Sequence, residues 1–293
     1  MTKTLATSEN MISKVEFAKV TALALLLSLT SANAKIIKGR VSSDSGNPMG
    51  GVMISAFDKQ HKKSTSVFSR ADGSFKIDGL RNTKFNVRAR LMGQLDIWQK
   101  GIAVGTDKLA FKMKPATGWD LEKQRTSNSA FGMLNWDNIK DKENFKMMCT
   151  YCHQPGTVGF RTPEKPVDWH TMITRMDGFG GLYRHTQKTI VKRLINTYSD
   201  EAVKKWPKFE PPPAPKGIET RAKITEWDMG RQYKAMVHDI ELGPDGLVYA
   251  VDMGQNAVVT LDPESGERKV YHFPRGARGP HSIELGNDGK MWF

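Results

Sequence analysis

The sequence of 293 residues predicts a multidomain protein that joins an all-β sandwich, an all-α domain and an incomplete all-β propeller. Three observations lead to this fold class. Residues 35–116 hold short runs of alternating apolar and polar residues between Gly, Asp and Pro, which is typical of an antiparallel sandwich. Residues 117–205 hold runs with apolar residues three or four apart, which is typical of amphipathic helices. Residues 218–293 contain a 43-residue repeat, and an all-β period of this size is typical of a propeller blade.

An export signal is predicted at residues 1–34. Lysines precede the apolar run at residues 20–30, and the small residues Ala32 and Ala34 follow it. A charged start, a short apolar run and a small-residue exit describe a cleaved secretory signal. A membrane span needs roughly 20 apolar residues, so this run is too short for an anchor. We therefore expect a mature chain that begins at Lys35, has no membrane span and is periplasmic or otherwise exported.

Residues 35–116 give the pattern of the sandwich. The strands expected are KIIKGRV, GVMISAF, the run after the Asp-Gly turn at 72–73, and KFNVRARL. The order of glycines and core positions resembles carboxypeptidase regulatory-like domains, which have a transthyretin-like sandwich. The resemblance implies an accessory module, and some of these domains belong to a carbohydrate-binding-like fold group. No stacked aromatic platform is evident in the sequence, so sugar binding is not favoured here.

Two helices are expected after the cysteines, in VDWHTMITRM and in HTQKTIVKRLINTYSDEA. In the second, Thr186 is the predicted cap. Its apolar face is predicted to consist of Ile190, Val191, Leu194, Ile195 and Tyr198. The Pro-rich segment at residues 206–217 then reads as a semi-rigid linker and a domain boundary.

The stretch MMCTYCHQPG holds both cysteines of the chain, Cys149 and Cys152, with His153 directly behind them. Exported domains that use cysteines for stability generally carry several, so a single close pair indicates chemistry. A thioredoxin-like pair should open a helix in a βαβ unit, whereas the flanks here are predicted to be helical on both sides. A structural zinc site needs four ligands, and this motif offers three.

C-x-x-C-H is the attachment signature of c-type haem. Two thiols add across the two vinyl groups of the porphyrin, and a three-residue helical separation lets both thiols reach it. His153 then lies under the iron as the proximal ligand. Export agrees with this cofactor, because c-type haem is generally installed outside the cytoplasm. The sequence therefore predicts one covalent haem c held by Cys149 and Cys152.

The residues that follow the motif resemble a small class I cytochrome c domain. They comprise a loop with Arg161, the pattern W-x-x-x-I-x-x-M at residues 169–176, a glycine-rich turn and a C-terminal helix. The resemblance implies that Met176 is the distal iron ligand, with Met172 as the alternative one helical turn earlier. A thioether ligand raises the potential of the iron and suits electron transfer.

Other side chains complete the expected surroundings of the haem. His170 or His185 as the distal ligand would give a bis-histidine haem of lower potential. Trp169, Phe145 and Tyr198 are expected to pack against the macrocycle.

The 43-residue repeat begins at His238 and again at His281, and Tyr249 in the first copy corresponds to Trp292 in the second. The pattern P-H-S-I-x-L-G-x-D-G-x-x-W-F resembles the propellers of virginiamycin B lyases, which open a lactone by metal-assisted elimination. A propeller closes with at least four blades. Since the sequence holds one blade and the start of a second, we expect it to be the front part of a longer protein. We interpret the two histidines as repeated structural residues.

The net charge of +13 and the pI of about 9.6 favour anionic partners. No dense run of Lys and Arg with interleaved aromatics occurs, so no nucleic-acid partner is expected. The predicted function is one-electron transfer at a haem c, with a redox protein partner that has an acidic docking surface. Two alternatives stay open. One is a lyase or oxidoreductase with its substrate site on the propeller, and the other is a scaffold that binds glycans or proteins.

Overall fold

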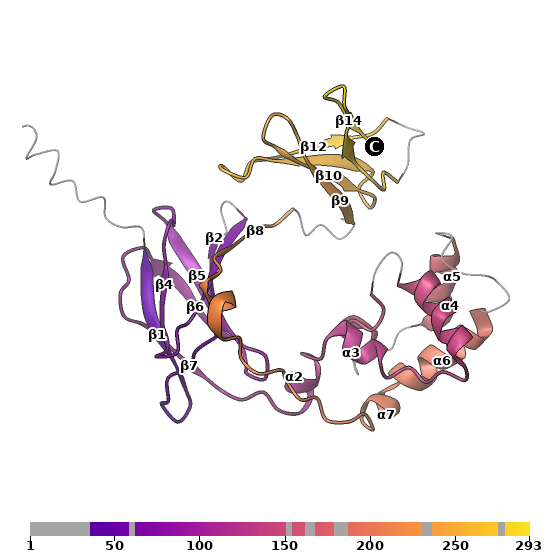
Figure 1. Cartoon of the computed structure of the whole chain (residues 1–293), viewed down its shortest axis with the longest axis horizontal. Helices are drawn as coiled ribbons and strands as arrows, with labels where there is room; N and C mark the ends of the chain where they lie inside the picture. The colour runs from indigo at the N-terminus through magenta and orange to yellow at the C-terminus, as the bar shows by residue number, and fades with distance from the viewer. Residues whose placement is uncertain are drawn as a thin grey trace, which may run out of the picture. The chain divides into compact units, whose positions relative to one another are not determined.

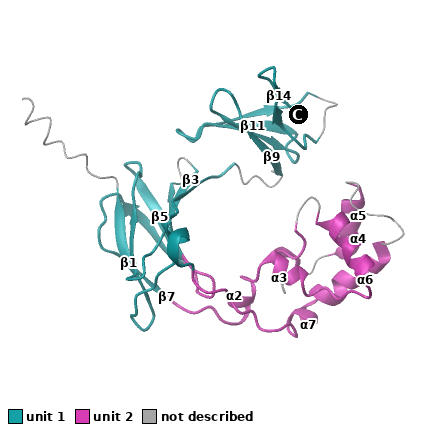
Figure 2. Cartoon of the chain, in the orientation of Figure 1, with its two compact units in different colours: residues 1–89, 97–112, 215–293 teal, residues 90–96, 113–214 magenta. Residues whose placement is uncertain are grey.

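A computed structural model describes residues 36–58, 62–150, 154–161, 168–178, 187–229, 236–274 and 279–293 (Figure 1). The chain forms two compact units (Figure 2). Unit 1 comprises residues 1–89, 97–112 and 215–293, and unit 2 comprises residues 90–96 and 113–214. The predicted export signal lies outside the described residues. None of the described helices is long and apolar enough to cross a membrane.

The predicted N-terminal β-sandwich is confirmed, and it consists of two sheets in unit 1. One sheet has the strand order β4-β1-β7 and the other has the order β6-β5-β2-β3-β8. The strands are β1 (Ile37–Ser43), β2 (Met53–Asp58), β3 (Lys63–Phe68), β4 (Ser74–Ile77), β5 (Lys84–Arg90), β6 (Ile97–Ala103), β7 (Leu109–Met113) and β8 (Ile224–Trp227).

The core of the sandwich follows the alternation of the sequence, since successive side chains of a strand point to opposite faces. Phe85, Val87 and Ala89 of β5 are buried, while the residues between them are half-buried. The close packing of β1 against β7 requires glycine at position 39. A Cβ atom there would lie 1.9 Å from the carbonyl oxygen of Leu109 in β7.

The predicted Asp-Gly turn joins β3 to β4. Gly73 has a φ of 77°, a conformation that glycine adopts without steric cost. The Asp72 carboxylate accepts hydrogen bonds from the backbone N–H of Ser74 (2.9 Å) and from its hydroxyl (2.6 Å). These bonds, chiefly the one from the hydroxyl, hold the pKa of Asp72 below its ordinary value.

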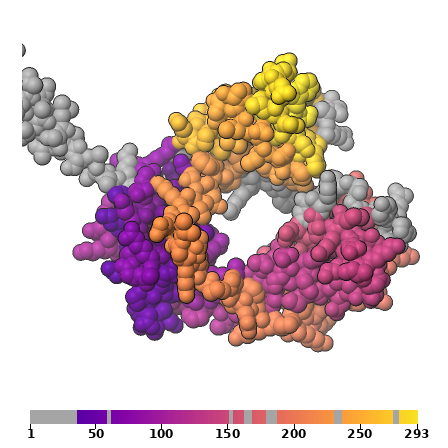
Figure 3. Space-filling view, in the orientation of Figure 1, coloured from indigo at the N-terminus to yellow at the C-terminus, as the bar shows by residue number. Residues whose placement is uncertain are grey.

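The strand β8 differs from the sequence-based expectation that residues 218–293 belong to the propeller. After the short helix η3 (Gly217–Arg221), β8 pairs with β3 in antiparallel register. Ser64 of β3 donates a hydrogen bond to the Glu226 carboxylate of β8 (3.2 Å). Figure 3 shows this returning segment, in orange, lying on the surface of the sandwich strands. The short stretch ITEW joins the sandwich because β3 offers it an edge to pair with.

A small helical region is confirmed in unit 2. Its elements are α2 (Gly118–Glu122), α3 (Ser127–Phe131), α4 (Ile139–Cys149), η1 (Val158–Phe160), α5 (Trp169–Gly178), α6 (Gln187–Tyr198) and α7 (Asp200–Val203). Side-chain caps start four of them, because the first backbone N–H groups of a helix need partners. Thr126 caps α3, Asn138 caps α4, Asp168 caps α5 and Ser199 caps α7.

The predicted apolar face of α6 is largely present. Val191, Leu194 and Tyr198 are buried, and Ile190 packs against the same core. Ile195 is 42% exposed and does not belong to that face. The predicted cap, Thr186, lies outside the described residues.

The C-terminal part of unit 1 is a further antiparallel sheet. Its strands are β9 (Val237–Leu242), β10 (Val248–Asp252), β11 (Ala257–Leu261) and β12 (Arg268–His272), in the order β12-β11-β10-β9. A second hairpin follows, made of β13 (Glu284–Leu285) and β14 (Met291–Trp292).

The repeat in the sequence corresponds to two equivalent hairpin turns. Asp245 accepts a hydrogen bond from the Tyr249 hydroxyl (2.8 Å), and Asp288 accepts one from the Trp292 indole (3.2 Å). Each aromatic ring lies against the glycine that opens its turn. A Cβ atom on Gly243 would come 2.4 Å from the Tyr249 ring, so the glycine and the aromatic residue recur together.

Candidate functional site

Cys149 is the last residue of α4 and is half-buried. The helix begins where the Asn138 side chain accepts a hydrogen bond from the backbone N–H of Asp141 (2.9 Å). Burial raises the pKa of the Cys149 thiol to about 12. Cys152 and His153, the other two residues of the predicted haem motif, lie outside the described residues.

Cys149 packs against an apolar cluster that brings together most of the described candidate residues. Phe145 is 4% exposed and Trp169 is 8% exposed, and Met176 and Cys149 pack against the same core. The buried members of the cluster are Ala130, Leu134, Phe145, Trp169, Ile173, Val191, Leu194 and Tyr198. The cluster therefore draws on α3, α4, α5 and α6.

The two methionine candidates for the distal position differ in their surroundings. Met176 contacts the cluster, whereas Met172 is half-buried and is not among the described residues that pack against it. His170 is exposed on α5, and His185 lies outside the described residues. Of the three candidates that the structure describes, Met176 is the one that packs against the cluster of Cys149.

Tyr198 connects this cluster to neighbouring aromatic rings. Its ring stacks on Trp169 with centroids 5.8 Å apart and meets Trp206 edge-on at 5.9 Å. The hydroxyl donates a hydrogen bond to the carbonyl of Ala130 (3.3 Å). Burial raises the pKa of Tyr198 to about 12, so this side chain stays protonated.

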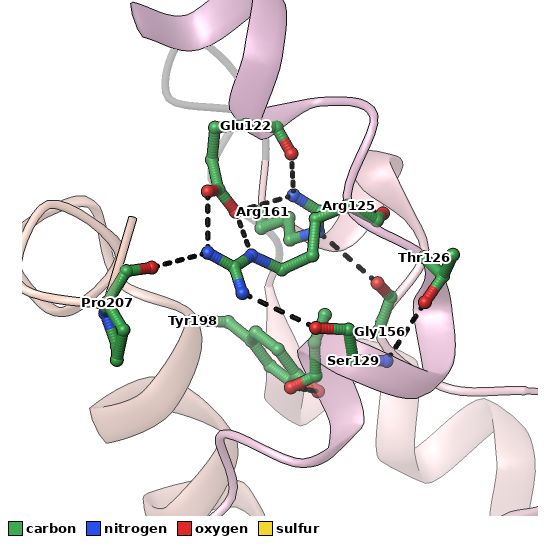
Figure 4. Close-up of polar contacts among 9 residues, drawn as sticks. Glu122, Arg125, Thr126, Ser129, Gly156, Arg161, Tyr198 and Pro207 are labelled. Carbon is green, nitrogen blue, oxygen red and sulfur yellow. Dashed lines mark hydrogen bonds and ion pairs between the residues drawn. The ribbon is translucent and has the colours of Figure 1, made fainter. Parts of the chain in front are cut away.

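A buried ionic network lies beside the cluster (Figure 4). The Arg161 side chain is fully buried and the Arg125 side chain is 3% exposed, and both pair with the Glu122 carboxylate, at 3.2 and 2.6 Å. Buried charges persist only when they are paired and hydrogen-bonded. Burial lowers the pKa of Arg161, and the charge of Glu122 opposes this effect.

The guanidinium N–H groups of Arg161 donate hydrogen bonds to backbone carbonyls. They reach the carbonyls of Glu122 (2.9 Å), Arg125 (2.5 Å) and Gly156 (3.3 Å). The residue therefore fixes the segment that follows the haem motif to the α2–α3 region. The sequence pattern indicated Arg161 in its loop but not Glu122, at the end of α2, or Arg125, in the bend that follows it.

The cluster places one thiol, that of Cys149, and one thioether, that of Met176, against the same apolar and aromatic core. A covalent haem would need Cys152 and His153 beside them, and both lie outside the described residues. Among the described residues, no group of three or more His, Cys, Asp or Glu side chains could hold a metal ion.

The repeated histidines of the C-terminal sheet contact each other. The rings of His238 and His281 lie 3.8 Å apart, and Nδ1 of His238 lies 2.8 Å from the carbonyl oxygen of His281. Asp239 accepts a hydrogen bond from the backbone N–H of Ile283 (3.0 Å). These contacts join the two repeats, which agrees with a structural role for both histidines.

Sequence reasoning missed an aromatic pair on the sandwich. Phe57 of β2 and Trp98 of β6 have ring centroids 5.1 Å apart, and the Arg88 guanidinium lies over both rings. Trp98 is 46% exposed. The two rings come from strands far apart in the chain, so only the sheet topology brings them together.

Comparison with known proteins assigns the N-terminal sandwich. Residues 36–113 match the model of the carboxypeptidase regulatory-like domain, so this part of the chain is such a domain. No curated protein sequence matches the chain.

Solved structures give distant matches. A catalytically inactive virginiamycin B lyase from Staphylococcus aureus with quinupristin is 20% identical, with a TM-score of 0.22, over 26% of this chain and 25% of the lyase. Two mutant type II cohesin–X-dockerin complexes from Acetivibrio cellulolyticus are 15% identical, with TM-scores of 0.24 and 0.23. They match over 28% and 27% of this chain and 58% and 56% of theirs. The chain thus spans less than two thirds of each of these proteins.

Proposed function

We propose that this chain is an exported c-type cytochrome that carries single electrons through one haem c. The observation that carries the proposal is the C-x-x-C-H motif, whose first cysteine ends α4 against the aromatic cluster that also contacts Met176. The family model matches residues 36–113 and does not reach the motif. The proposed cytochrome assignment of residues 117–205 therefore rests on the motif and on this cluster.

The residues of the site have separate tasks in this proposal. Cys149 and Cys152 would hold the macrocycle through their thiols, and His153 and Met176 would bind the iron. When bound, haem supplies an iron centre that gains and loses one electron. Phe145 and Trp169 exclude water from it, which limits the reorganisation that a change of charge requires.

The basic surface supports the proposed type of partner. A net charge of +13 attracts anionic surfaces and accelerates encounter with them at low ionic strength. We therefore propose a redox protein with an acidic docking surface as the partner.

Covalent attachment is the property that tests the proposal. The full chain, expressed with export and haem-attachment machinery, should keep its haem through acid–acetone extraction and give a c-type pyridine haemochrome spectrum. Cys149→Ala with Cys152→Ala should abolish retention, while Met147→Ala, at an exposed position of the same helix, should not. A haem that is extracted from the unaltered chain would contradict the proposal.

The aromatic pair on the sandwich favours a second candidate function, a glycan-binding scaffold. Trp98 is 46% exposed beside Phe57, and a sugar ring could stack on its exposed part. A glycan array probed with the full chain and with Trp98→Ala tests this candidate, because only binding that disappears in the variant supports it.

The lyase or oxidoreductase alternative draws less support from the described residues. Its expected groups are histidines on the propeller, but His238 and His281 are engaged with each other.

A further inference from the structure

Unit 2 contains a cavity of about 520 Å³ that the proposed function does not use. It lies among α2, α7 and the segment 204–209, and three aromatic residues, Trp119, Trp206 and Phe209, line it. Sites for small molecules commonly have volumes of about 300–1,000 Å³ and mainly apolar linings with a few polar groups. The size and the lining therefore suit a small organic molecule with aromatic rings.

The charges around this cavity favour an anion. Lys204 and Lys208 line it and are exposed. Arg125 lies over the rings of Trp206 and Phe209, at 5.5 and 5.2 Å from their centroids.

Two carboxylates also line the cavity, and one of them is already neutralised. Glu122 is paired with Arg125 and Arg161, whereas Asp200 lies in the first turn of α7. The lining holds two lysines and two carboxylates, and the two arginines paired with Glu122 make the local charge positive. A cationic ligand would meet net repulsion, and a neutral ligand would make no use of the two lysines.

We propose that this cavity binds a planar aromatic anion, with fused rings and carboxylate or sulfonate groups at its edge. The rings would stack on Trp119 and Trp206, since aromatic faces attract one another in offset or edge-on geometry. The acid groups would meet Lys204 and Lys208 in charge-assisted hydrogen bonds.

The cavity also adjoins the proposed electron-transfer site. Trp206, which lines it, packs against the cluster of Cys149 and contacts the Tyr198 ring. The binding site stands independently of haem attachment, because all its lining residues belong to α2, α7 and the segments beside them.

The experiment titrates the full chain with naphthalene-2,6-disulfonate by isothermal titration calorimetry and by quenching of tryptophan fluorescence. Replacing both lysines, Lys204→Gln with Lys208→Gln, should weaken binding by about tenfold or more, since the acid groups lose both charge-assisted partners. Both side chains are exposed, so this variant should fold. The neutral analogue naphthalene-2,6-diol should bind the unaltered chain at least about tenfold more weakly.

The matched control removes the same charge elsewhere in unit 2. Lys188→Gln with Lys192→Gln, at exposed positions of α6, should bind as the unaltered chain does. Equal weakening by both double variants would assign the binding to the general charge of the protein and overturn the site. So would the absence of binding. Trp206→Leu should abolish binding, and chains that lack haem should still bind, so that failure of the cytochrome proposal is recognised separately.

Discussion

Arg161 is a single residue that organises the segment behind the haem motif. Its side chain is fully buried, and its donors reach backbone carbonyls on both sides of the motif in sequence. Because no water reaches the guanidinium, each of these bonds replaces hydration that the group has lost. A neutral residue of similar length would leave three carbonyls and part of a carboxylate without this partner.

Replacement of Arg161 by methionine should therefore destabilise unit 2. Breaking a buried pair by removing one partner costs about 3–5 kcal/mol. Urea denaturation followed by the helical circular dichroism signal measures the loss. Arg175→Met, at an exposed position of α5, is the control and should change stability by less than about 0.5 kcal/mol. Equal losses in the two variants would refute the role assigned to Arg161.

Met176 allows a spectroscopic test of the distal ligand. Met176→Ala should remove the weak long-wavelength band of ferric Met/His haem and lower the reduction potential, because the thioether favours the reduced iron. Met172→Ala, one helical turn earlier on α5, is the matched control and should keep both. The opposite pattern would move the ligand to Met172, and unchanged spectra in both would indicate His170 or His185.

Single residues differ in how far the sequence predicts them. Phe145 and Trp169, which the sequence predicts to pack at one site, are buried in the same cluster. The spacing predicts Ile195 on the apolar face of α6, but this side chain is 42% exposed. The buried face of α6 is therefore narrower than its run of apolar residues indicates. Trp98 and Phe57 meet only through sheet pairing, which no local pattern encodes.

At the scale of elements, the two repeated hairpins have the same kind of turn, with Tyr249 in one copy and Trp292 in the other. The turn aspartate accepts a backbone N–H and an aromatic donor in each copy, from Leu247 and Tyr249 or from Lys290 and Trp292. These hydrogen bonds favour the ionised carboxylate. They lower the pKa of Asp245, chiefly through the Tyr249 hydroxyl, and that of Asp288, chiefly through the Lys290 backbone N–H.

The stability of the two turns should depend on pH through the Asp245 and Asp288 carboxyl groups. A carboxyl group whose pKa is lowered by folding contributes stability above its unfolded pKa, about 3.9 for Asp, and loses it as the pH falls through the folded value. Acidification below this range should therefore loosen both turns. Carbon-detected NMR titration should show that Tyr249→Phe raises the pKa of Asp245 and leaves that of Asp288 unchanged. An unchanged Asp245 would show that the tyrosine bond is not formed in solution.

Elements with strong local patterns could be predicted, and those that depend on distant pairing could not. Alternation gave β5, and helical spacing gave α5 and α6. The four residues of β8 carry no comparable signal, since their partner β3 lies far away in the sequence. The C-x-x-C-H pattern stands out because its three residues lie within five positions, whereas the Glu122 network required the fold.

For the whole molecule, the export prediction has a simple consequence. Cleavage after Ala34 should leave a mature chain that begins at or near Lys35, because the small-residue exit is what signal peptidase recognises. Intact-mass analysis of the protein from the periplasm measures this end, and the same protein expressed without the export pathway is the control. A mature mass that retains the apolar run would indicate an anchored protein instead.

The return of the chain to the sandwich through β8 makes the helical segment an insertion rather than a tail. The polypeptide enters unit 2 after β7 and comes back to pair with β3, so the segment is tethered at both ends. Closing a loop removes conformational freedom from its unfolded form, and the penalty grows only slowly with length. While the sandwich is intact, unfolding of this insertion therefore gains less entropy than unfolding of a free domain. A proteolytic cut inside it would leave two pieces that β8 and β3 still hold together.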